Sequence, residues 1–447
     1  MTGHGAAEAV SPTSITFILS SIIFVVTFAL ILTEKVHRTV IGMFGACVMV
    51  TAGIFLHFYS PSEALRCIDF NTIGLLLGMM TIVAILEGTG AFQYLAILSA
   101  KKTKGDPWML VVVLGTITTL VSLILDNVTT VVLIAPVTII IARILEVSAA
   151  PTLMAEALLS DTGGVATLVG DPPNIMIGSA APFTFNDFIF HIAPIVVVAW
   201  FVTLICLRFC FRKELAIKPK NIDKLMKMNE WDAMKDWKTC KIIMGVLCLV
   251  VAIFFVHHAI HMPPSMVALI GASICLIIIT PKRDPQPILE KVEWSVLLFF
   301  AALFVIVGGL EHSGVLGYLA GSVSGLAHGN LIVAALVIMW VSAVASAAVD
   351  NIPFTMAMIP VIQNLETLGV PVNILWWSLA LGVGFGGNGT PIGSTANVVV
   401  VAKSEQTDDP ITFARWFKSG SIAMLATLIV ATLAILIFPT WLEGPYR

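Results

Sequence analysis

The chain has 447 residues, of which 58% are hydrophobic and 11% are charged, and its formal net charge is −3. A soluble domain carries about 25% charged residues, and no soluble packing arrangement could bury this much apolar surface. The composition shows no nucleic-acid-binding signature, and the small net charge points to no particular class of partner. These values indicate a polytopic protein of the lipid bilayer.

Apolar segments long enough to cross a bilayer recur along the whole chain. The first of them precedes the first basic residue, Lys35. A secretory signal opens with positive charge, so this segment is expected to be a true span that begins outside. The apolar segments are 15–33, 39–57, 70–86, 107–125, 128–147, 152–180, 186–208, 242–259, 264–280, 294–310, 330–349, 352–367, 373–402 and 419–440.

Basic residues between these segments predict the orientation of the chain. They are Lys35 and Arg38, Lys101, Lys102 and Lys104, the basic residues of 212–241, Lys282 and Arg283, and Lys403, Arg415 and Lys418. Suppose that the segment pairs in 107–147 and 330–367 are hairpins that enter and leave on one face. Then 22 of the 24 Lys and Arg residues fall inside, and Arg66 and Arg447 fall outside. The positive-inside bias therefore favours ten crossings, two re-entrant hairpins and both termini outside the inner membrane.

The two halves of the sequence repeat each other at a spacing of 224 residues. The matched pairs are 68–96 with 292–320, Asp126-Asn127 with Asp350-Asn351 and, one residue out of phase, 163–177 with 386–400. Chance is a poor explanation for three collinear matches. Each half then contains three crossings, a hairpin, a broken crossing and a final crossing. Because five crossings is an odd number, the second half is expected to lie upside down relative to the first.

The expected fold is an all-α polytopic membrane protein with an inverted repeat of five crossings plus one re-entrant hairpin per half, and with broken helices at the midplane. The first repeat is 1–211, with its N-terminus outside, and the second is 242–447. Between them, 212–241 carries nine basic and five acidic residues. It is expected to be a solvated cytoplasmic linker, and a regulatory surface is the alternative. Inverted repeats of this kind characterise many secondary transporters.

An acid and an amide occupy the tip of each predicted hairpin: Asp126-Asn127 in the first and Asp350-Asn351 in the second. A carboxylate at membrane depth is energetically costly and usually functional. Each Asp is therefore a candidate proton carrier or sodium ligand. The alternative, which is compatible with function, is that each Asp caps the helix of the returning arm.

The two broken crossings are rich in Gly, Pro, Thr and Asn, which cannot maintain a regular helix through the membrane. Irregular backbone at that depth is tolerated where it lines a cavity or is buried in protein. Its free carbonyls can bind cations, and its half-helix N-termini attract anionic or oxygen-bearing groups. Neutral hydrogen-bonding groups there are Thr167, Asn174, Asn388, Thr390, Ser394, Thr395 and Asn397, and Asp171 completes the candidate set.

Other polar residues give weaker signals. Asp161 and Glu156 could assist proton transfer along the first broken crossing, whereas Glu87 and Glu311 could equally extend to the interface. Two sets of potential metal ligands have plainer explanations, as small apolar residues of a helix and as interfacial histidines. They are Cys206 with Cys210, and His257 with His258 and His261. No metal site is therefore expected.

Several motifs resemble those of the ion transporter superfamily, in the branch of arsenite permeases, NhaD-type sodium–proton antiporters and the melanosomal P protein (the ArsB/NhaD branch). They include DNVTTVVLIAPVTI at 126–139, GGVATLVGDPPNIMIGS at 163–179 and GGNGTPIGSTANVV at 386–399. The resemblance implies a site between the hairpin tips and the broken helices. The ligands it implies are Asn127, Thr129, Thr130, Thr167, Asn174, Asn351, Thr355, Asn388, Thr390, Ser394 and Asn397.

The leading functional hypothesis is proton-coupled efflux of arsenite or antimonite, small neutral solutes that suit a hydrogen-bonding site without Lys or Arg. Sodium–proton antiport is the alternative, and transport of an inorganic anion or a carboxylate is third. A passive channel and an intramembrane aspartyl protease are less consistent with the repeat, so no enzyme is expected. No cofactor is expected beyond a proton or sodium as coupling ion. The resemblance implies a homodimer, and ATP-driven pumping would require a soluble ATPase partner.

Overall fold

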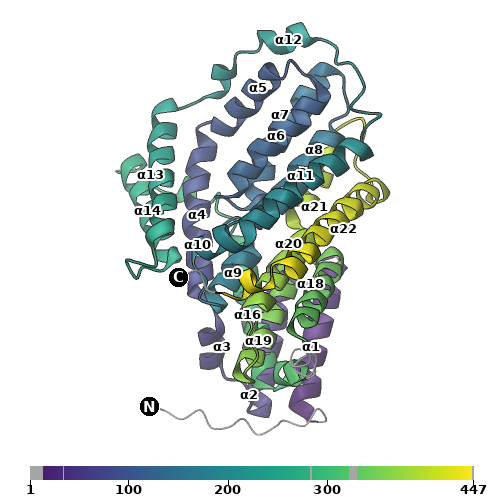
Figure 1. The fold of residues 1–447 in the computed structure, drawn as a ribbon. Helices are drawn as coiled ribbons and strands as arrows, with labels where there is room; N and C mark the ends of the chain where they lie inside the picture. Colours follow the sequence, from purple (N-terminus) through teal and green to yellow (C-terminus); the bar gives the residue numbers. More distant parts are fainter. Residues whose placement is uncertain (1–13, 34, 282–283, 322–329, 445–447) are drawn as a thin grey trace.

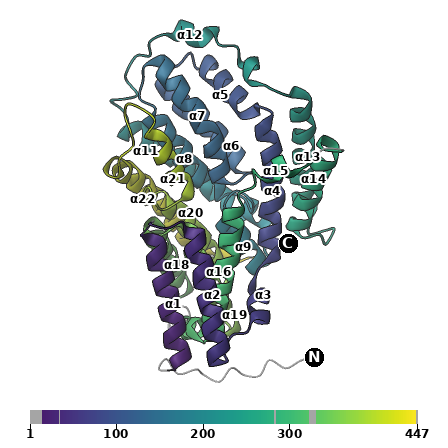
Figure 2. The same cartoon turned by 180° about the vertical axis from the view of Figure 1, so that it is seen from behind.

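The computed structural model describes residues 14–33, 35–281, 284–321 and 330–444. Some residues used above to predict the orientation lie outside this part of the chain: Lys282, Arg283, Arg447 and the first 13 residues. Within it, all regular secondary structure is helical. Figures 1 and 2 show the helices packed into one elongated bundle, with α12 at one end and α1 and α2 at the other.

The helices follow the predicted apolar segments closely. The first half contains α1 (Ile15–Leu32), α2 (Arg38–Leu56), α3 (Pro61–Cys67), α4 (Phe70–Gly88), α5 (Ala91–Lys102), α6 (Pro107–Ser122), α7 (Asn127–Leu145), α8 (Ala150–Gly164), α9 (Pro172–Ala180), α10 (Phe185–Asp187), the π-helical turn η1 (Phe188–Ile192) and α11 (Ala193–Cys210). The segment 152–180, expected to be a broken crossing, is divided into α8 and α9.

The second half has the same order of long helices. After α12 (Ile222–Lys227) and the 3₁₀ turn η2 (Glu230–Ala233) come α13 (Trp237–Val256), α14 (Pro264–Ile279), α15 (Gln286–Leu289), α16 (Trp294–His312), α18 (Leu331–Ala348), α19 (Asn351–Thr367), α20 (Asn373–Gly387), α21 (Thr395–Ser404), α22 (Phe413–Ile437) and α23 (Pro439–Glu443). The segment 373–402 is divided into α20 and α21.

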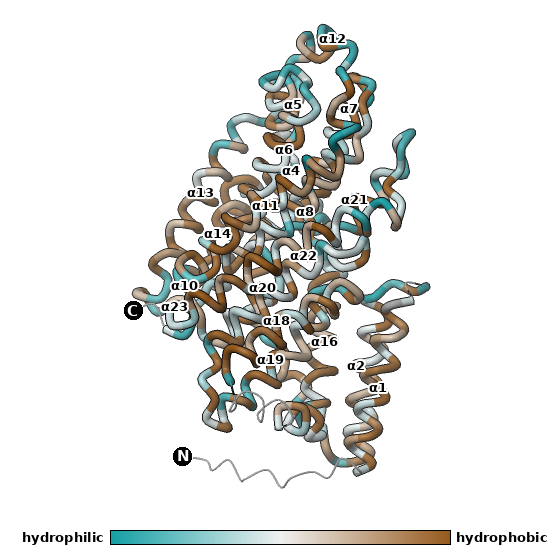
Figure 3. The backbone as a smooth tube through the Cα atoms, turned by 45° about the vertical axis from the view of Figure 1, so that its right-hand side comes forward, coloured by the Kyte–Doolittle hydropathy of each residue, from teal (hydrophilic) through white to brown (hydrophobic). Residues whose placement is uncertain are grey.

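Eight helices of the described chain are long and apolar enough to cross a membrane. They are Arg38–Leu56, Phe70–Gly88, Asn127–Leu145, Phe185–Cys210, Trp237–Val256, Trp294–His312, Leu331–Ala348 and Phe413–Ile437. Three shorter apolar helices are Ile15–Ile31, Pro107–Ser122 and Pro264–Ile279. The protein is therefore a polytopic membrane protein, and Figure 3 shows its hydrophobic residues along these helices and hydrophilic ones around α12.

Helix packing repeats at the spacing found in the sequence. Helix α4 packs against α14 as α16 packs against α2, and α6 packs against α8 as α18 packs against α20. Glycines permit the closest of these approaches: a Cβ on Gly386 would lie 2.5 Å from the Cα of Ala343. Small residues at helix crossings allow such contact within a bilayer.

The segment 212–241 is more structured than a solvated linker. Its helix α12 places Leu225 in a fully buried position beside α5 and α7. Lys101 of α5 donates to the Met228 carbonyl at 2.9 Å and pairs with Glu230 at 2.5 Å. The next helix begins at Trp237. We call residues 222–233 the strap, because they lie across α5 and α7.

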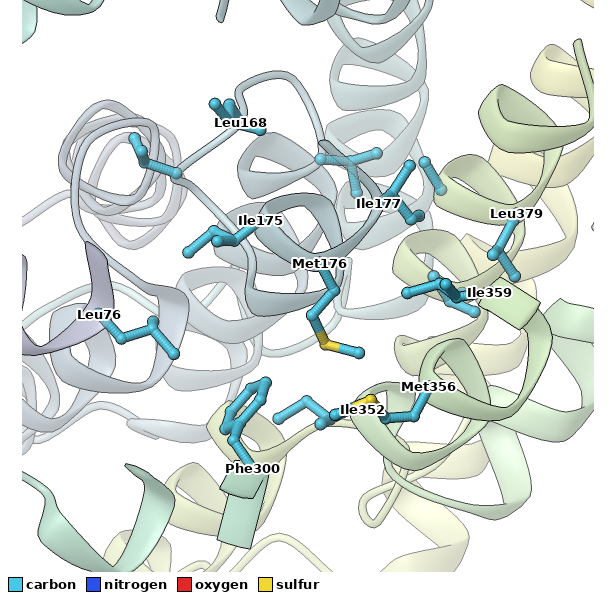
Figure 4. Packing of buried hydrophobic residues seen from close by; sticks show 14 of the residues in the cluster. Leu76, Leu168, Ile175, Met176, Ile177, Phe300, Ile352, Met356, Ile359 and Leu379 are labelled. Atoms are coloured by element: carbon cyan, nitrogen blue, oxygen red, sulfur yellow. The ribbon is translucent and has the colours of Figure 1, made fainter. Parts of the chain in front are cut away.

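One hydrophobic cluster joins residues around the first helix break to α20, which precedes the second break. Figure 4 shows Met176 of α9 pointing toward Ile352 and Met356 of α19. Trp377 of α20 stacks on Phe183 with ring centroids 4.1 Å apart. This close packing fixes the helix ends that surround the breaks.

Candidate functional site

An asparagine closes each helix break in the same way. Asn174 Nδ2 donates to the carbonyl of Thr167 at 2.8 Å, and Asn397 Nδ2 donates to the carbonyl of Thr390 at 3.1 Å. Both asparagines are buried. They satisfy main-chain carbonyls that the interrupted helices leave free, so we call Asn174 and Asn397 the staple asparagines.

A threonine in each break ties it to the neighbouring hairpin. Thr167 Oγ1 donates to the carbonyl of Leu123 at 2.6 Å, and Thr390 Oγ1 donates to the carbonyl of Ala347 at 2.5 Å. Both acceptors lie just before a hairpin tip. These hydroxyl protons are therefore committed to main-chain carbonyls, which supports a structural role for two residues predicted to be ligands.

The Asp at each hairpin tip caps the helix that follows it, as the alternative interpretation predicted. Asp126 is the N-cap of α7 and accepts from Thr129 N at 2.9 Å and Thr129 Oγ1 at 2.7 Å. Thr130 Oγ1 donates to the carbonyl of Asp126 at 2.9 Å. Asp350 is the N-cap of α19, but its contact with Ile352 N is 3.5 Å long. The first tip is therefore closed by its own helix, and the second tip is not.

Five buried side chains meet between the tips and the breaks. Asn127 Nδ2 donates to Asp161 Oδ1 at 2.8 Å, and Ser394 Oγ donates to the same oxygen at 3.1 Å. Asn351 Nδ2 lies 3.3 Å from both carboxylate oxygens of Asp171. All five residues are at most 5% exposed. We call Asp161, Asp171, Asn127, Asn351 and Ser394 the central cluster.

The central cluster lies where four helices begin. Asn127 and Asn351 are the first residues of α7 and α19, while Asp171 and Ser394 are the N-caps of α9 and α21. Helix N-termini carry partial positive charge and favour nearby anions. The fold thus stabilises carboxylates here with peptide dipoles and neutral hydrogen-bond donors.

An arginine from a distant part of the sequence reaches the second tip. Arg38 Nη1 donates to Asp350 Oδ2 at 2.5 Å and to Thr395 Oγ1 at 2.8 Å. Thr395 Oγ1 also donates to Asp350 Oδ2, at 2.8 Å. The guanidinium lies over the ring of Phe299, 5.4 Å from its centroid. The prediction that no Lys or Arg lies near either motif is therefore wrong.

Sequence reasoning missed Arg38 because it counted this residue among the charged connectors. Arg38 is the first residue of α2, and its side chain is only 25% exposed. An arginine bordering an apolar segment was the available signal, but it did not specify a partner 312 residues away. A cleft of about 290 Å³, lined by Arg38, Asp350 and Thr395 among others, leads to this ion pair.

The remaining candidates lie at varying distances from the central cluster. Asn388 Nδ2 donates to Thr162 Oγ1 at 2.9 Å, which joins the two broken crossings. Thr355 Oγ1 donates to the carbonyl of Asn351 within α19, at 2.8 Å. Glu87 is outside the cluster, in an exposed pair with Lys291 at 3.3 Å. Among the described residues no group of three His, Cys, Asp or Glu could hold a metal ion.

The central carboxylates have neutral hydrogen-bond partners. Asp161 and Asp171 bond to amides and a hydroxyl, and Asp161 Oδ2 has no hydrogen-bond partner within the described chain. Arg38, the basic side chain that reaches this region, is already paired with Asp350. Burying an uncompensated carboxylate is costly. The arrangement is suited to bind a proton or a small cation.

These features, with irregular helices meeting inside a polytopic bundle, define the class of membrane transport proteins. Residues 28–382 match the CitMHS family, described as "Citrate transporter", and the chain belongs to this family. It is a transporter-family protein and not an enzyme.

The chain is similar to several known proteins along nearly its whole length. A 46 kDa membrane protein of Mycobacterium leprae is 39% identical over 423 residues, which cover 93% of this chain and 97% of that protein. An uncharacterized transporter of Mycobacterium tuberculosis is 38% identical over 417 residues, covering 92% and 96% of the two chains. Neither name states a substrate.

Two further similarities bear on the expectations from sequence. The human P protein is 32% identical over 490 residues, covering 92% of this chain but 58% of the P protein, which confirms the similarity to the P protein. The YdaH transporter of Alcanivorax borkumensis has a TM-score of 0.59 over 96% of this chain and 100% of that chain. At 13% identity this second likeness concerns the fold alone.

Proposed function

We propose that this protein is a secondary transporter that exchanges protons for a small cation, with Asp161 and Asp171 as the groups for which the two compete. The observation that carries this proposal is that both carboxylates are buried at the meeting point of four helix N-termini with neutral partners only. A proton or a cation neutralises the same charge. Occupancy by one therefore displaces the other, which is the basis of antiport.

The proposal includes an alternating-access architecture. The two halves, 1–211 and 242–447, are inverted repeats of five crossings and one hairpin, joined on the cytoplasmic side, with both termini outside the inner membrane. The matched staple asparagines and threonine anchors support this reading, because equivalent residues make equivalent hydrogen bonds. Sites at such repeat interfaces are exposed alternately to the two sides.

The charge of the site supports a cation over citrate, the substrate named in the family description. Proteins commonly bind carboxylates with arginine in bidentate geometry. Arg38 is neutralised by Asp350, and Asp161 and Asp171 would repel an anion. This charge balance favours sodium–proton antiport of the NhaD type, which the sequence placed second.

Arsenite or antimonite efflux, the leading hypothesis from sequence, remains a second candidate on a specific observation. The amide oxygens of Asn174, Asn388 and Asn397 are buried and have no hydrogen-bond partner among the described residues. These acceptors suit the hydroxyl groups of a neutral trihydroxide. Proton coupling through Asp161 and Asp171 would then drive the solute outward.

The test uses everted vesicles that contain the protein and a pH-sensitive dye. With an imposed proton gradient, addition of sodium, potassium or lithium should partly collapse the gradient, and Asp161→Asn or Asp171→Asn should abolish this response. A parallel measurement follows uptake of radiolabelled arsenite. Arsenite uptake without any cation response would overturn cation–proton exchange in favour of the second candidate, and citrate uptake would overturn both.

A further inference from the structure

Three buried oxygen atoms without hydrogen-bond partners in the described chain belong to side chains of α8. They are Glu156 Oε2, Ser160 Oγ and Asp161 Oδ2, and the three residues are at most 2% exposed. Glu156 and Ser160 are four residues apart, so their side chains are neighbours on one helix face. Asp161 follows Ser160 in the chain and points about 100° further around the helix. Buried polar atoms without a protein partner are ordinarily hydrogen-bonded to ordered water.

The polar groups of α8 are connected to the neighbouring helix α7 by one hydroxyl group, that of Thr138. Thr138 Oγ1 of α7 donates to Glu156 Oε1 at 2.5 Å. Thr138 also lines a narrow cavity of about 10 Å³, about the smallest space that holds one water molecule. Val147 and Ser148 line both this cavity and a wider cleft of about 350 Å³. Polar groups thus extend from Asp161 toward an open cleft.

The mouth of this route carries a network of charged groups. Arg415 pairs with Glu214 at 2.5 Å and with Asp409 at 2.7 Å. Glu214 lines the narrow cavity, and Asp409 lines the wide cleft. Partial burial alone would raise the pKa of Asp409, but hydrogen bonds from Ser148 and Arg415 hold that pKa below its usual value. These hydrogen bonds therefore stabilise the ionised form of Asp409 at the mouth.

The equivalent positions in the second half are apolar. At the offset of the broken crossings, Glu156, Ser160 and Asp161 correspond to Leu379, Val383 and Gly384. Helix α20 nevertheless packs on α18 as α8 packs on α6. The polar row is therefore not needed to build this helix pair.

We propose that α8 carries a proton path from Asp161 to the cleft beside Ser148, with Glu156 as the intermediate carrier and Ser160 and Thr138 as hydroxyl relays. The proposal rests on the proposed proton-coupled function and specifies where the proton enters and leaves.

Each step conserves charge and atoms. Protonated Asp161 gives its proton through Ser160 and water to the Glu156 carboxylate, which leaves Asp161 ionised and free to bind a cation. Protonated Glu156 then releases the proton through Thr138 to water in the cleft. The reverse sequence loads Asp161 again.

None of the charged groups on the described helices around α8 forms an ion pair with Glu156. Besides Asp161 on α8 itself, the titratable residues on the packed helices are Arg143 on α7, Cys206, Arg208 and Cys210 on α11, Lys403 on α21, and Arg415 and Lys418 on α22. In the described chain, Glu156 bonds to Thr138 alone. Its charge can therefore change without breaking an ion pair.

The experiment compares two exchange modes in proteoliposomes. Cation-driven proton movement requires the path, whereas isotopic sodium–sodium exchange at equal pH on both sides does not. Glu156→Gln should slow the first by about a hundredfold, the scale of a lost proton-transfer group, and leave the second unchanged. Thr138→Val should act in the same direction, and Thr138→Ser should restore the rate.

A matched pair of serines provides the control. Ser160 and Ser378 are both buried hydroxyls without partners in the described chain, but Ser378 lies in α20. Ser160→Ala should slow proton movement, and Ser378→Ala should not. Equal slowing by both variants, or loss of both exchange modes in Glu156→Gln, would overturn the path in favour of a packing role.

A spectroscopic measurement tests the path even if no cation is exchanged for protons. Infrared difference spectra of the purified protein between acidic and alkaline pH should contain a carboxyl band that disappears in Glu156→Gln and shifts in Thr138→Val. Absence of that band would overturn the proposal. Its presence together with absent cation exchange would refute the proposed function alone.

Discussion

The two broken crossings share a backbone design and differ in charge. In both, a staple asparagine and an anchoring threonine hold the break against the preceding hairpin. The first break carries Asp161 and Asp171, whereas the second has Gly384 and Ser394 at the corresponding positions. The repeat therefore supplies the geometry of the site, while one half supplies its central carboxylates.

The hairpin tips differ in a complementary way. Asp126 is hydrogen-bonded within its own helix end. Asp350 relies on Arg38 of α2 and on Thr395 of α21. The tip of the second half is therefore paired with a fixed positive charge, Arg38 of the first half, whereas Asp161 and Asp171 of the first half have no charged partner.

The largest effect is expected when the first break is made to resemble the second. Asp161→Gly places the second-half residue at the central cluster, and it removes the acceptor of Asn127 and Ser394. Cation-driven proton movement should fall by at least about a hundredfold. Dye-based transport assays in proteoliposomes measure this, and undiminished exchange would show that the asymmetry of charge is not functional.

The two staple asparagines should contribute equally to the stability of the folded protein. Asn174→Ala and Asn397→Ala each leave buried carbonyls without a donor, which costs about 1–3 kcal/mol of stability. Thermal unfolding of the purified variants in detergent should give similar decreases in Tm. A large decrease in only one variant would contradict the shared backbone design.

Two matched glycines should respond unequally. A Cβ on Gly386 would meet the Ala343 main chain at 2.5 Å, whereas a Cβ on Gly163 would meet the Thr119 side-chain methyl. A methyl group can move aside more easily than backbone, and overpacking costs about 1–3 kcal/mol. Gly386→Ala should therefore lower the Tm more than Gly163→Ala, and the reverse order would show that α6 and α8 are the more rigid pair.

The smallest effect is expected at the strap, which lies between the two halves. Lys101 hydrogen-bonds Glu230 and lowers the pKa of that carboxyl. Because the pKa of Glu230 is lower in the folded state, its pair with Lys101 stabilises the strap at pH values above the pKa of unfolded Glu, about 4.3. This stabilisation is lost as the pH falls through the folded-state pKa of Glu230.

Hydrogen exchange of residues 222–233, corrected for intrinsic rates, measures the strap directly. Lys101→Ala should accelerate exchange at neutral pH, and the wild-type protein should approach that behaviour in acid. Lys102→Ala is the control, since among the described contacts the strap is bound by Lys101. Equal acceleration by both variants would assign the effect to net charge.

Sequence predicted the local features of this molecule well. Span positions and both breaks follow from the lengths of apolar segments and from clusters of Gly, Pro and Asn, which act over a few residues. The tips of the hairpins followed from Asp-Asn pairs that also cap helices.

Long-range features were not predictable in the same way. Arg38 and Asp350 are 312 residues apart, and no local pattern specifies that contact. Asp161 was expected only to assist proton transfer along the first broken crossing, yet it accepts from Asn127 and Ser394. Thr167 was assigned as a ligand from its residue type, although its proton goes to a main-chain carbonyl.

The staple asparagines have a consequence for how such proteins diversify. Their amide groups bind main-chain carbonyls, which every residue type provides, so the shape of each break does not depend on the side chains next to it. Positions 161, 171, 384 and 394 can therefore exchange acids, hydroxyls and glycines while the architecture persists. Substitutions at these positions would change the charge beside the breaks and leave their backbone shape intact.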